Sequence, residues 1–211
     1  MIRMVKLRPL PTSSRSIRHG WRAAHGFSLM EVLIALIVLS LGLLGAVGMQ
    51  AASLASNKET RNFSVALDLS RDLADRMRGN YDVASKTLSS DNPYLMADIT
   101  LTSSTTVNAA TTNCITGTCT ADQLAAWDVA EWQAKAKAAL PSPRIVVCFD
   151  QEPFNTTTGN PQWACTGTGT QAVIKLAWTR NAGGNGGVLQ ASDTSVLPLV
   201  IVPLTSGYTD L

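Results

Sequence analysis

Histidine is absent from almost the whole chain. The only two, His19 and His25, lie in the first 26 of its 211 residues. Histidine is the commonest general base near neutral pH and the commonest metal ligand, and no nucleophile elsewhere has a recognisable base beside it. Charged residues are also scarce, at 15% against 45% hydrophobic residues. This composition argues against enzyme chemistry and global disorder, and it favours a packed core.

Acidic residues are missing from the first 26 residues. This segment instead holds six basic residues, which are Arg3, Lys6, Arg8, Arg15, Arg18 and Arg22. The remaining 185 residues carry 11 of the 17 basic residues and all 15 acidic ones, a net charge of −4. Without the basic segment the protein is mildly acidic, which disfavours nucleic-acid binding by a broad basic surface.

Charge of either sign is missing from the 26 residues between Val32 and Asn57. A helix over 27–49 would be about 34 Å long at 1.5 Å per residue, enough to cross a hydrocarbon core of about 30 Å. A buried core helix is the alternative, but the basic flank favours a membrane span. That flank stays in the cytoplasm by the positive-inside rule, so the chain after Met49 is exported. A secretory signal fits less well, because its apolar core is usually ~7–15 residues long.

A single carboxylate lies at the start of this apolar segment, within Gly26-Phe27-Ser28-Leu29-Met30-Glu31. A carboxylate inside a membrane costs a few kcal/mol unless it is paired or near the interface. The simpler interpretation is that Glu31 only favours the dipole of the helix N-terminus. Its neighbours Gly26 and Phe27 favour a functional charge instead.

This junction resembles the leader junction of type IV prepilins and type II secretion pseudopilins. In that family a prepilin peptidase cuts after the glycine and methylates the new N-terminal residue, which implies cleavage after Gly26 and N-methylation of Phe27. The resemblance also implies that Glu31 pairs with the N-terminal amine of a neighbouring subunit during filament assembly. Two opposite charges in a low-dielectric core stabilise each other.

The rest of the chain predicts an α+β head behind one long helix. No proline occurs between Pro11 and Pro93, so a helix can run from Phe27 to about Gly79, amphipathic in its second half. The apolar positions of that half include Phe63, Ala66, Leu67, Leu69, Ser70, Leu73, Ala74 and Met77. A second helix is predicted from Thr120 to Leu140, before Pro141. Strands are predicted at Ile99–Val107, Arg144–Phe149, Gln171–Arg180 and Val196–Val202.

The sequence does not decide the role of three glycines in the long helix or of two tryptophans in the second helix. Gly42, Gly45 and Gly48 recur every three residues, which predicts either close helix packing or a bendable helix. Trp127 and Trp132 are five residues apart, so at least one is expected in the core. The glycine-rich segment 183–187 is expected to be a hairpin connection or a disordered loop.

Four cysteines in an exported domain predict two disulfides. Of three connectivities we prefer Cys114–Cys119 and Cys148–Cys165, because each closes a local loop next to a predicted element. A zinc site is disfavoured by the compartment and the spacing. Asp150, Glu152 and Asn155 could gather around calcium, but a solvated turn is the preferred interpretation.

The second half of the chain narrows the resemblance to PilV-type minor pilins. The residues that carry it are the Cys-x4-Cys pair, Asp128, Glu131-Trp132, Leu140-Pro141 and Ala177-Trp178. By this resemblance, residues 1–26 are a cytoplasmic leader that is removed, 27–80 a long helix with 27–49 in the membrane or filament core, and 81–211 a periplasmic head. The long helix would pack on a small antiparallel sheet.

The resemblance implies a role in assembly, without cofactor or metal. The expected partners are the prepilin peptidase, the major pilin, other minor pilins, a pilus-tip adhesin and the inner membrane, with a final place in the pilus, at its tip. The nearest alternative is a minor pseudopilin of type II secretion. A DNA-uptake pilin is disfavoured by the charge of −4, and a membrane-anchored periplasmic enzyme by the missing histidine and catalytic constellation.

Overall fold

The computed structural model describes residues 26–181 and 187–204 of the chain. Its longest element is helix α1 (Leu29–Gly79), which is followed by the short helix α2 (Tyr81–Ala84) and by helix α3 (Ala121–Ala139). The chain divides into two compact units, residues 1–50 and residues 51–211. The first part of α1 belongs to the N-terminal unit and its second part to the C-terminal unit, here called the head.

The described part of the N-terminal unit is a short segment without regular secondary structure, followed by an apolar helix. α1 begins after Ser28, whose hydroxyl accepts a hydrogen bond from the backbone N–H of Met30 at 3.3 Å. Such a contact satisfies one of the free N–H groups at a helix start. A window of 18 residues in this helix has a mean hydropathy of 2.7, and none of it is buried. By length and composition the helix can cross a membrane.

The head is built on an antiparallel sheet of four strands in the order β1-β2-β3-β6. The strands are β1 (Met96–Thr100), β2 (Arg144–Phe149), β3 (Ala172–Ala177) and β6 (Val200–Leu204). In the central pair, Arg144 lies opposite Ala177 and Phe149 opposite Ala172. Two short strands, β4 (Arg180–Asn181) and β5 (Val188–Leu189), pair separately.

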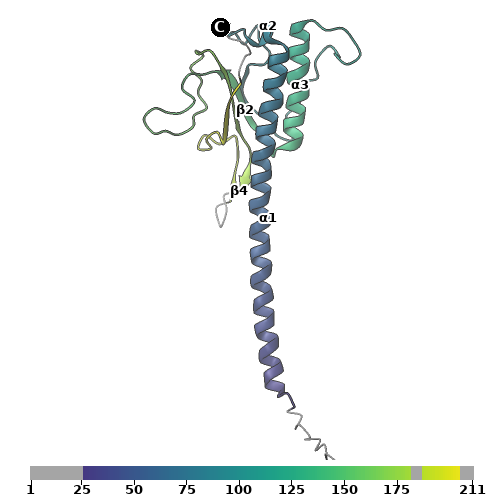
Figure 1. Ribbon diagram of the computed structural model, residues 1–211, viewed down its shortest axis with the longest axis vertical. Coiled ribbons are helices and arrows are strands. Elements are labelled where there is room, and N and C mark those ends of the chain that lie inside the picture. Colours follow the sequence, from purple (N-terminus) through teal and green to yellow (C-terminus); the bar gives the residue numbers. More distant parts are fainter. Residues whose placement is uncertain (1–25, 182–186, 205–211) are drawn as a thin grey trace, which may run out of the picture. The chain divides into compact units, whose positions relative to one another are not determined.

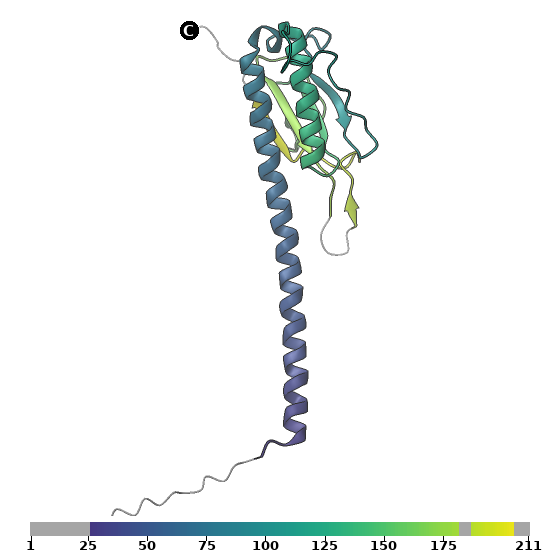
Figure 2. The ribbon, with the colours of Figure 1, turned by 90° about the vertical axis from the view of Figure 1, so that its right-hand side faces the viewer.

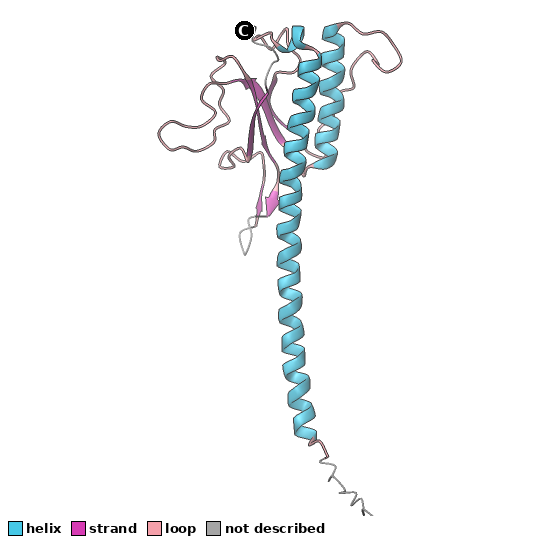
Figure 3. Ribbon diagram, in the orientation of Figure 1, coloured by secondary structure: helices cyan, strands magenta, loops and turns pink. Residues whose placement is uncertain are grey.

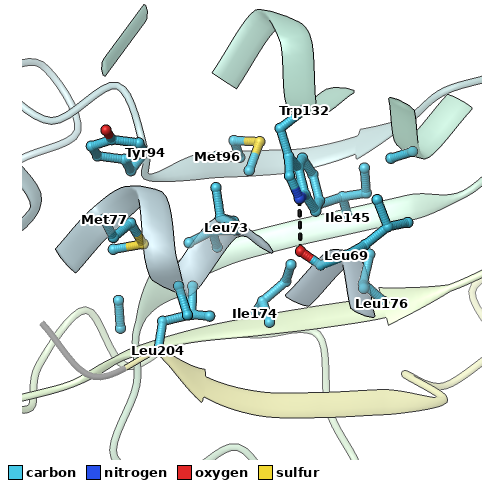
Figure 4. Close-up of a cluster of buried hydrophobic side chains, with 14 of the residues drawn as sticks. Leu69, Leu73, Met77, Tyr94, Met96, Trp132, Ile145, Ile174, Leu176 and Leu204 are labelled. Atoms are coloured by element: carbon cyan, nitrogen blue, oxygen red, sulfur yellow. Dashed lines mark hydrogen bonds between the residues drawn. The ribbon is translucent and has the colours of Figure 1, made fainter. Parts of the chain in front are cut away.

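Two helices lie side by side against one face of the sheet, namely the second half of α1 and α3 (Figures 1 and 2). Figure 3 distinguishes these helices from the strands by colour. The core lies between the two layers, where the indole N–H of Trp132 donates to the Leu69 carbonyl at 2.8 Å (Figure 4). Buried side chains of this core include Leu73, Met77, Ile145, Ile174 and Leu176. The predicted α+β architecture, a long helix on a small antiparallel sheet, is confirmed.

The predicted second helix is found as α3, and its start is fixed by a capping box. Thr120 Oγ1 accepts from the backbone N–H of Gln123 at 3.3 Å, and Gln123 Oε1 accepts from the backbone N–H of Thr120 at 2.9 Å. These two bonds satisfy two donors reciprocally at the helix start. The helix ends before Pro141, as predicted from the sequence.

The strand predicted at Ile99–Val107 was wrong for every residue after Thr100. The strand is β1, which starts at Met96 and ends at Thr100. After it, Thr105 Oγ1 donates to the Thr100 carbonyl at 3.1 Å and accepts from the backbone N–H of Thr102 at 3.0 Å. Hydroxyl side chains that bond the nearby backbone compete with a sheet ladder, so the threonine-rich segment turns instead of extending.

The last two predicted strands were displaced or interrupted. The strand predicted at Gln171–Arg180 is β3, which ends at Ala177, and β4 is a separate element. The strand predicted at Val196–Val202 begins only at Val200, because Pro198 lacks the N–H that a ladder uses. Pro203 is tolerated within β6 because this strand lies at an edge of the described sheet.

Candidate assembly site at the start of the N-terminal helix

Gly26 and Phe27 lie outside regular secondary structure, immediately before α1. A Cβ atom added to Gly26 would meet nothing within 4 Å, and Phe27 is exposed. The described fold therefore has room for a larger side chain at position 26. If only glycine is accepted there, the requirement comes from another molecule that binds this segment.

Glu31 lies in the first turn of α1, where its negative charge favours the positive end of the helix dipole. Together with Phe27 it lines a shallow hollow of about 440 Å³ whose other walls are Val32, Ala35, Leu36 and Leu39. Glu31 is the only ionisable group in this lining, and it forms no ion pair within the described residues. The arrangement offers one unpaired carboxylate on an apolar surface, which is suited to bind a cation that also brings apolar groups.

The apolar surface of α1 extends well beyond Glu31. All side chains from Phe27 to Lys58 are exposed in the single chain, and a Cβ added to Gly42, Gly45 or Gly48 would meet nothing within 4 Å. A contiguous apolar surface of this size marks contact with lipid or with another protein. The question whether the three glycines serve packing or bending stays open.

Two disulfides lie in the head. The structure links Cys114 to Cys119, with 5.6 Å between the Cα atoms, and Cys148 to Cys165, with 6.3 Å. These are the two pairs preferred from the sequence. Cys148, Asp150 and Cys165 also place potential metal-ligating atoms within 4.8 Å of one another, but sulfur atoms engaged in a disulfide are not available as thiolates.

Removal of either disulfide is expected to lower the free energy of unfolding by an amount that follows loop length. The chain-entropy model gives about 3 kcal/mol for a 17-residue separation and about 2 kcal/mol for a 5-residue one. We expect this order for the double variants Cys148→Ala/Cys165→Ala and Cys114→Ala/Cys119→Ala, compared by denaturant unfolding of the full chain in detergent, followed by tryptophan fluorescence. A larger loss for the short loop would contradict the expectation.

A buried ion pair adjoins the long-loop disulfide. Lys175 and Asp150 have fully buried side chains, and Lys175 Nζ lies 2.5 Å from Asp150 Oδ2. Burial alone would raise the pKa of Asp150, but the hydrogen bond from Lys175 and those from the backbone N–H groups of Glu152 and Thr166 outweigh it, so this pKa is lowered. Lys175 Nζ also donates to the Ala164 carbonyl at 2.6 Å. The pair thus ties the segment that ends at Cys165 to strand β3.

The same contacts bear on the calcium alternative. Asp150 Oδ1 accepts from the backbone N–H of Glu152 at 3.0 Å, and Asn155 Oδ1 accepts from those of Thr157 and Thr158 at 3.0 and 2.9 Å. These oxygen atoms shape their own turns. The solvated turn preferred from the sequence describes Asn155 well, whereas Asp150 is buried.

A polar network that the sequence patterns did not predict connects α1 to α3. Arg76 Nη1 donates to Asp128 Oδ1 at 2.7 Å, and the Tyr94 hydroxyl donates to Asp128 Oδ2 at 2.7 Å. Burial raises the pKa of Tyr94, and the hydrogen bond to Asp128 raises it further. An acidic residue in the middle of the apolar face of α3 was the one available signal, since a buried carboxylate needs partners.

Two family models match the chain. The model described as the prokaryotic N-terminal methylation motif matches residues 21–47, and the Tt1218-like model, described as type IV pilin Tt1218, matches residues 48–130. Together they run without a gap from residue 21 to residue 130. No curated protein and no solved structure gives a match.

A methylation motif on a membrane-length apolar helix, followed along the chain by a small α+β head, defines the class of pilin-like proteins. The chain belongs to the type IV pilin family, as the resemblance of its leader junction predicted. This family is structural rather than enzymatic. Membership implies processing by a prepilin peptidase and assembly with other pilins in a membrane-associated pilus, and the apolar helix fits anchoring in the inner membrane.

Proposed function

We propose that this chain is a minor pilin of the PilV type, which helps to initiate or cap a type IV pilus used in adhesion and twitching motility. The observation that carries the proposal is the unpaired carboxylate of Glu31 on the exposed apolar surface of a membrane-length helix. Inside a membrane, a single charge of this kind is costly without a partner. It is therefore expected to find one in a neighbouring subunit.

The proposed assembly begins with cleavage between Gly26 and Phe27. Residues 1–25 lie outside the described residues, so the proposed leader 1–26 rests on the sequence and on the matched methylation motif. The new amine of Phe27 would then be methylated. Residues 27–80 would form the helix that leaves the membrane for the filament core, and residues 81–211 the exported head.

The proposed partners are the major pilin, other minor pilins and an adhesin at the pilus tip, which is also the proposed location of this subunit. Two features support a specialised subunit. The head carries two disulfides, and the elements with the PilV resemblance, α3 with Asp128 and Trp132 and the end of β3, pack in its core.

Processing is tested first by the mass of the mature protein. We expect purified protein to begin with an N-methylated Phe27. Gly26→Ala is expected to be cleaved poorly and Gly26→Leu not at all, although the described fold has room for either side chain. Fragmentation mass spectrometry of the N-terminal peptide gives the readout, and Gly42→Ala serves as the control that should be cleaved normally. A mature N-terminus beyond Gly48 would contradict the proposal.

The place of assembly is tested by fractionation. We expect the subunit in sheared, purified pili at low abundance relative to the major pilin. Recovery of the protein only with components of a type II secretion system would favour the pseudopilin alternative.

A further inference from the structure

Lys58 and Arg61 are two basic residues of α1 whose charges the head does not use. Both side chains are exposed, and neither forms an ion pair within the described residues. Glu59, which lies between them in the chain, is engaged elsewhere. It accepts from the indole N–H of Trp178 at 3.3 Å and lies 3.7 Å from Arg180 Nη1. The two positive charges can therefore bind an anion of another molecule.

The place of the basic pair in the chain fits the thickness of a bilayer. The uncharged stretch between Glu31 and Lys58 has 26 residues, and as a helix at 1.5 Å per residue it covers about 39 Å. A bilayer with its headgroup regions is about 40–45 Å thick. When Glu31 lies at one surface of the membrane, a stretch of this length brings Lys58 to the headgroups of the other surface.

Apolar side chains lead along α1 directly to the basic pair. Ala51, Leu54, Lys58 and Arg61 follow one another at spacings of three and four within the helix, so they lie on one side of it. Leu54 is 69% exposed in the single chain. Lysine and arginine at the end of a membrane helix keep their stems along the apolar region while the charged groups reach the lipid headgroups.

Basic residues on this side of a membrane span need a reason. Lysine and arginine are usually more frequent on the cytoplasmic side, whereas Lys58 and Arg61 follow the span on its exported side. An anion fixed at the membrane surface is one reason to keep them there. The phosphate group of a phospholipid is such an anion, and it is present wherever the helix is anchored. A neighbouring subunit, in contrast, is present only after assembly.

The short strands β4 and β5 add an apolar side chain at the same end of the head. Val188 of β5 is 54% exposed and lines one hollow together with Ala55 of α1, and Figure 1 places β4 beside α1. Membrane surfaces bind apolar and basic side chains together. This end of the head therefore offers both kinds of contact to a bilayer.

We propose that Lys58 and Arg61 bind the headgroups of anionic phospholipids and thereby hold the head on the exported surface of the membrane before assembly. An arginine fork and a lysine ammonium are both suited to bind phosphate oxygens. The proposal rests on anchoring of the apolar helix in a membrane, and it does not depend on a PilV-type role in the pilus.

Lipid crosslinking tests the occupant. The full chain carries a benzophenone amino acid in place of Asn57, which is exposed one turn before Arg61. It is reconstituted in nanodiscs of equal parts phosphatidylglycerol and phosphatidylcholine. We expect adducts with phosphatidylglycerol to exceed those with phosphatidylcholine about fivefold or more, the factor that one basic residue gains near an anionic surface. Intact-protein mass spectrometry distinguishes the two adducts.

Two double variants separate the basic pair from general charge. Lys58→Gln/Arg61→Gln should bring the two adducts to equal yield. Arg71→Gln/Lys86→Gln removes the same charge from exposed ion pairs of the head and should leave the excess unchanged. Both double variants should keep the melting temperature of the wild type in detergent, since exposed charges contribute little to stability.

Three results overturn the proposal. The first is equal yield of the two adducts in the otherwise unchanged chain, and the second is an undiminished excess in Lys58→Gln/Arg61→Gln. The third is a clearly lowered melting temperature of that variant, because the pair would then serve the fold. A product that contains only a second copy of the chain would also assign the pair to contact between subunits. The nanodiscs hold no pilus, so none of these results bears on the proposed function, which fails if the protein is absent from purified pili.

Discussion

Glu31→Ala is expected to reduce the amount of this subunit in pili at least tenfold while leaving the protein folded, inserted and processed. The substitution makes the span more apolar, so insertion should not suffer. Glu31 lies in the N-terminal unit and lines a hollow formed only by residues of that unit. Its side chain therefore adds nothing to the core of the head.

The expected loss of incorporation comes from the positive charge that Glu31 would bind. If Glu31 binds the N-terminal amine of a neighbouring subunit, alanine leaves that amine unpaired in a dry environment. Breaking such a pair costs about 3–5 kcal/mol when it is fully buried, and a loss of only ~1.4 kcal/mol already corresponds to a tenfold change at equilibrium.

Quantitative immunoblotting of sheared pili against whole cells measures the incorporated fraction. Glu31→Gln keeps the shape without the charge and should behave like alanine. Glu152→Ala, whose side chain is exposed in the head, is the control that should be incorporated normally. Normal incorporation of Glu31→Ala would show that the charge has no role in assembly.

Asp150→Ala is expected to lower the free energy of unfolding by about 3–5 kcal/mol, the typical cost of removing one partner from a buried ion pair. The variant leaves the Lys175 ammonium buried without its counter-ion, since both side chains are fully buried. It also removes the oxygen that accepts from the backbone N–H groups of Glu152 and Thr166. Denaturant unfolding of the full chain in detergent gives the value.

A double variant separates the charge from the packing. Asp150→Leu/Lys175→Met removes both charges and keeps apolar volume, so it should recover much of the stability that Asp150→Ala loses. A double variant that is less stable than Asp150→Ala would show that the hydrogen bonds of Asp150, rather than its charge, dominate.

The Asp150–Lys175 pair also predicts in which direction the stability of the head changes with pH. Because the folded-state pKa of Asp150 is lowered from the ordinary value of 3.8, its contribution is fully present above that value. It is lost as the pH falls through the lowered pKa. The wild type should therefore lose stability more steeply below pH 3.8 than the double variant does.

Much of the fold followed from local patterns. The absence of proline and the change from an all-apolar to an amphipathic pattern predicted α1, which is observed from Leu29 to Gly79. The strand Arg144–Phe149 was predicted with its observed bounds, because a short run of β-branched and aromatic residues between a proline and a polar turn has few alternatives.

The inward face of α1 was predicted less well. Phe63 is one of the apolar positions of the predicted amphipathic half, but it is 45% exposed and contacts Trp178 edge-on. Asn62, one position earlier, is buried instead. Hydrophobic periodicity ranks residues by type, whereas the rotation of the helix on the sheet decides which side of the stripe is covered.

The sequence predicted no regular element between Gly79 and Ile99, but the structure has one. Within this stretch rich in Ser, Thr, Asn and Asp, the structure forms α2 and buries Val83, Ala84 and Tyr94. Asn92 explains part of this order, since its amide donates to the carbonyls of Ala84 and Lys86 at 3.1 and 2.7 Å. Such side-chain contacts to the backbone leave no periodic signal in a sequence.

The residues of the candidate site at the N-terminal helix could be predicted from the sequence. Gly26, Phe27 and Glu31 are neighbours along the chain, so their proximity needs no fold. The ion pairs Asp150–Lys175 and Arg76–Asp128 join residues that are 25 and 52 positions apart. No local pattern links residues at such separations.

The sequence alone therefore determined the membrane-length helix, its single carboxylate and the family. These properties depend on hydrophobicity, charge and short-range order, which are carried by consecutive residues. Only the tertiary structure decided which polar side chains of the head are buried and which of them satisfy one another. Burial and pairing depend on the packing of α1, α3 and the sheet, and packing is a property of the folded chain as a whole.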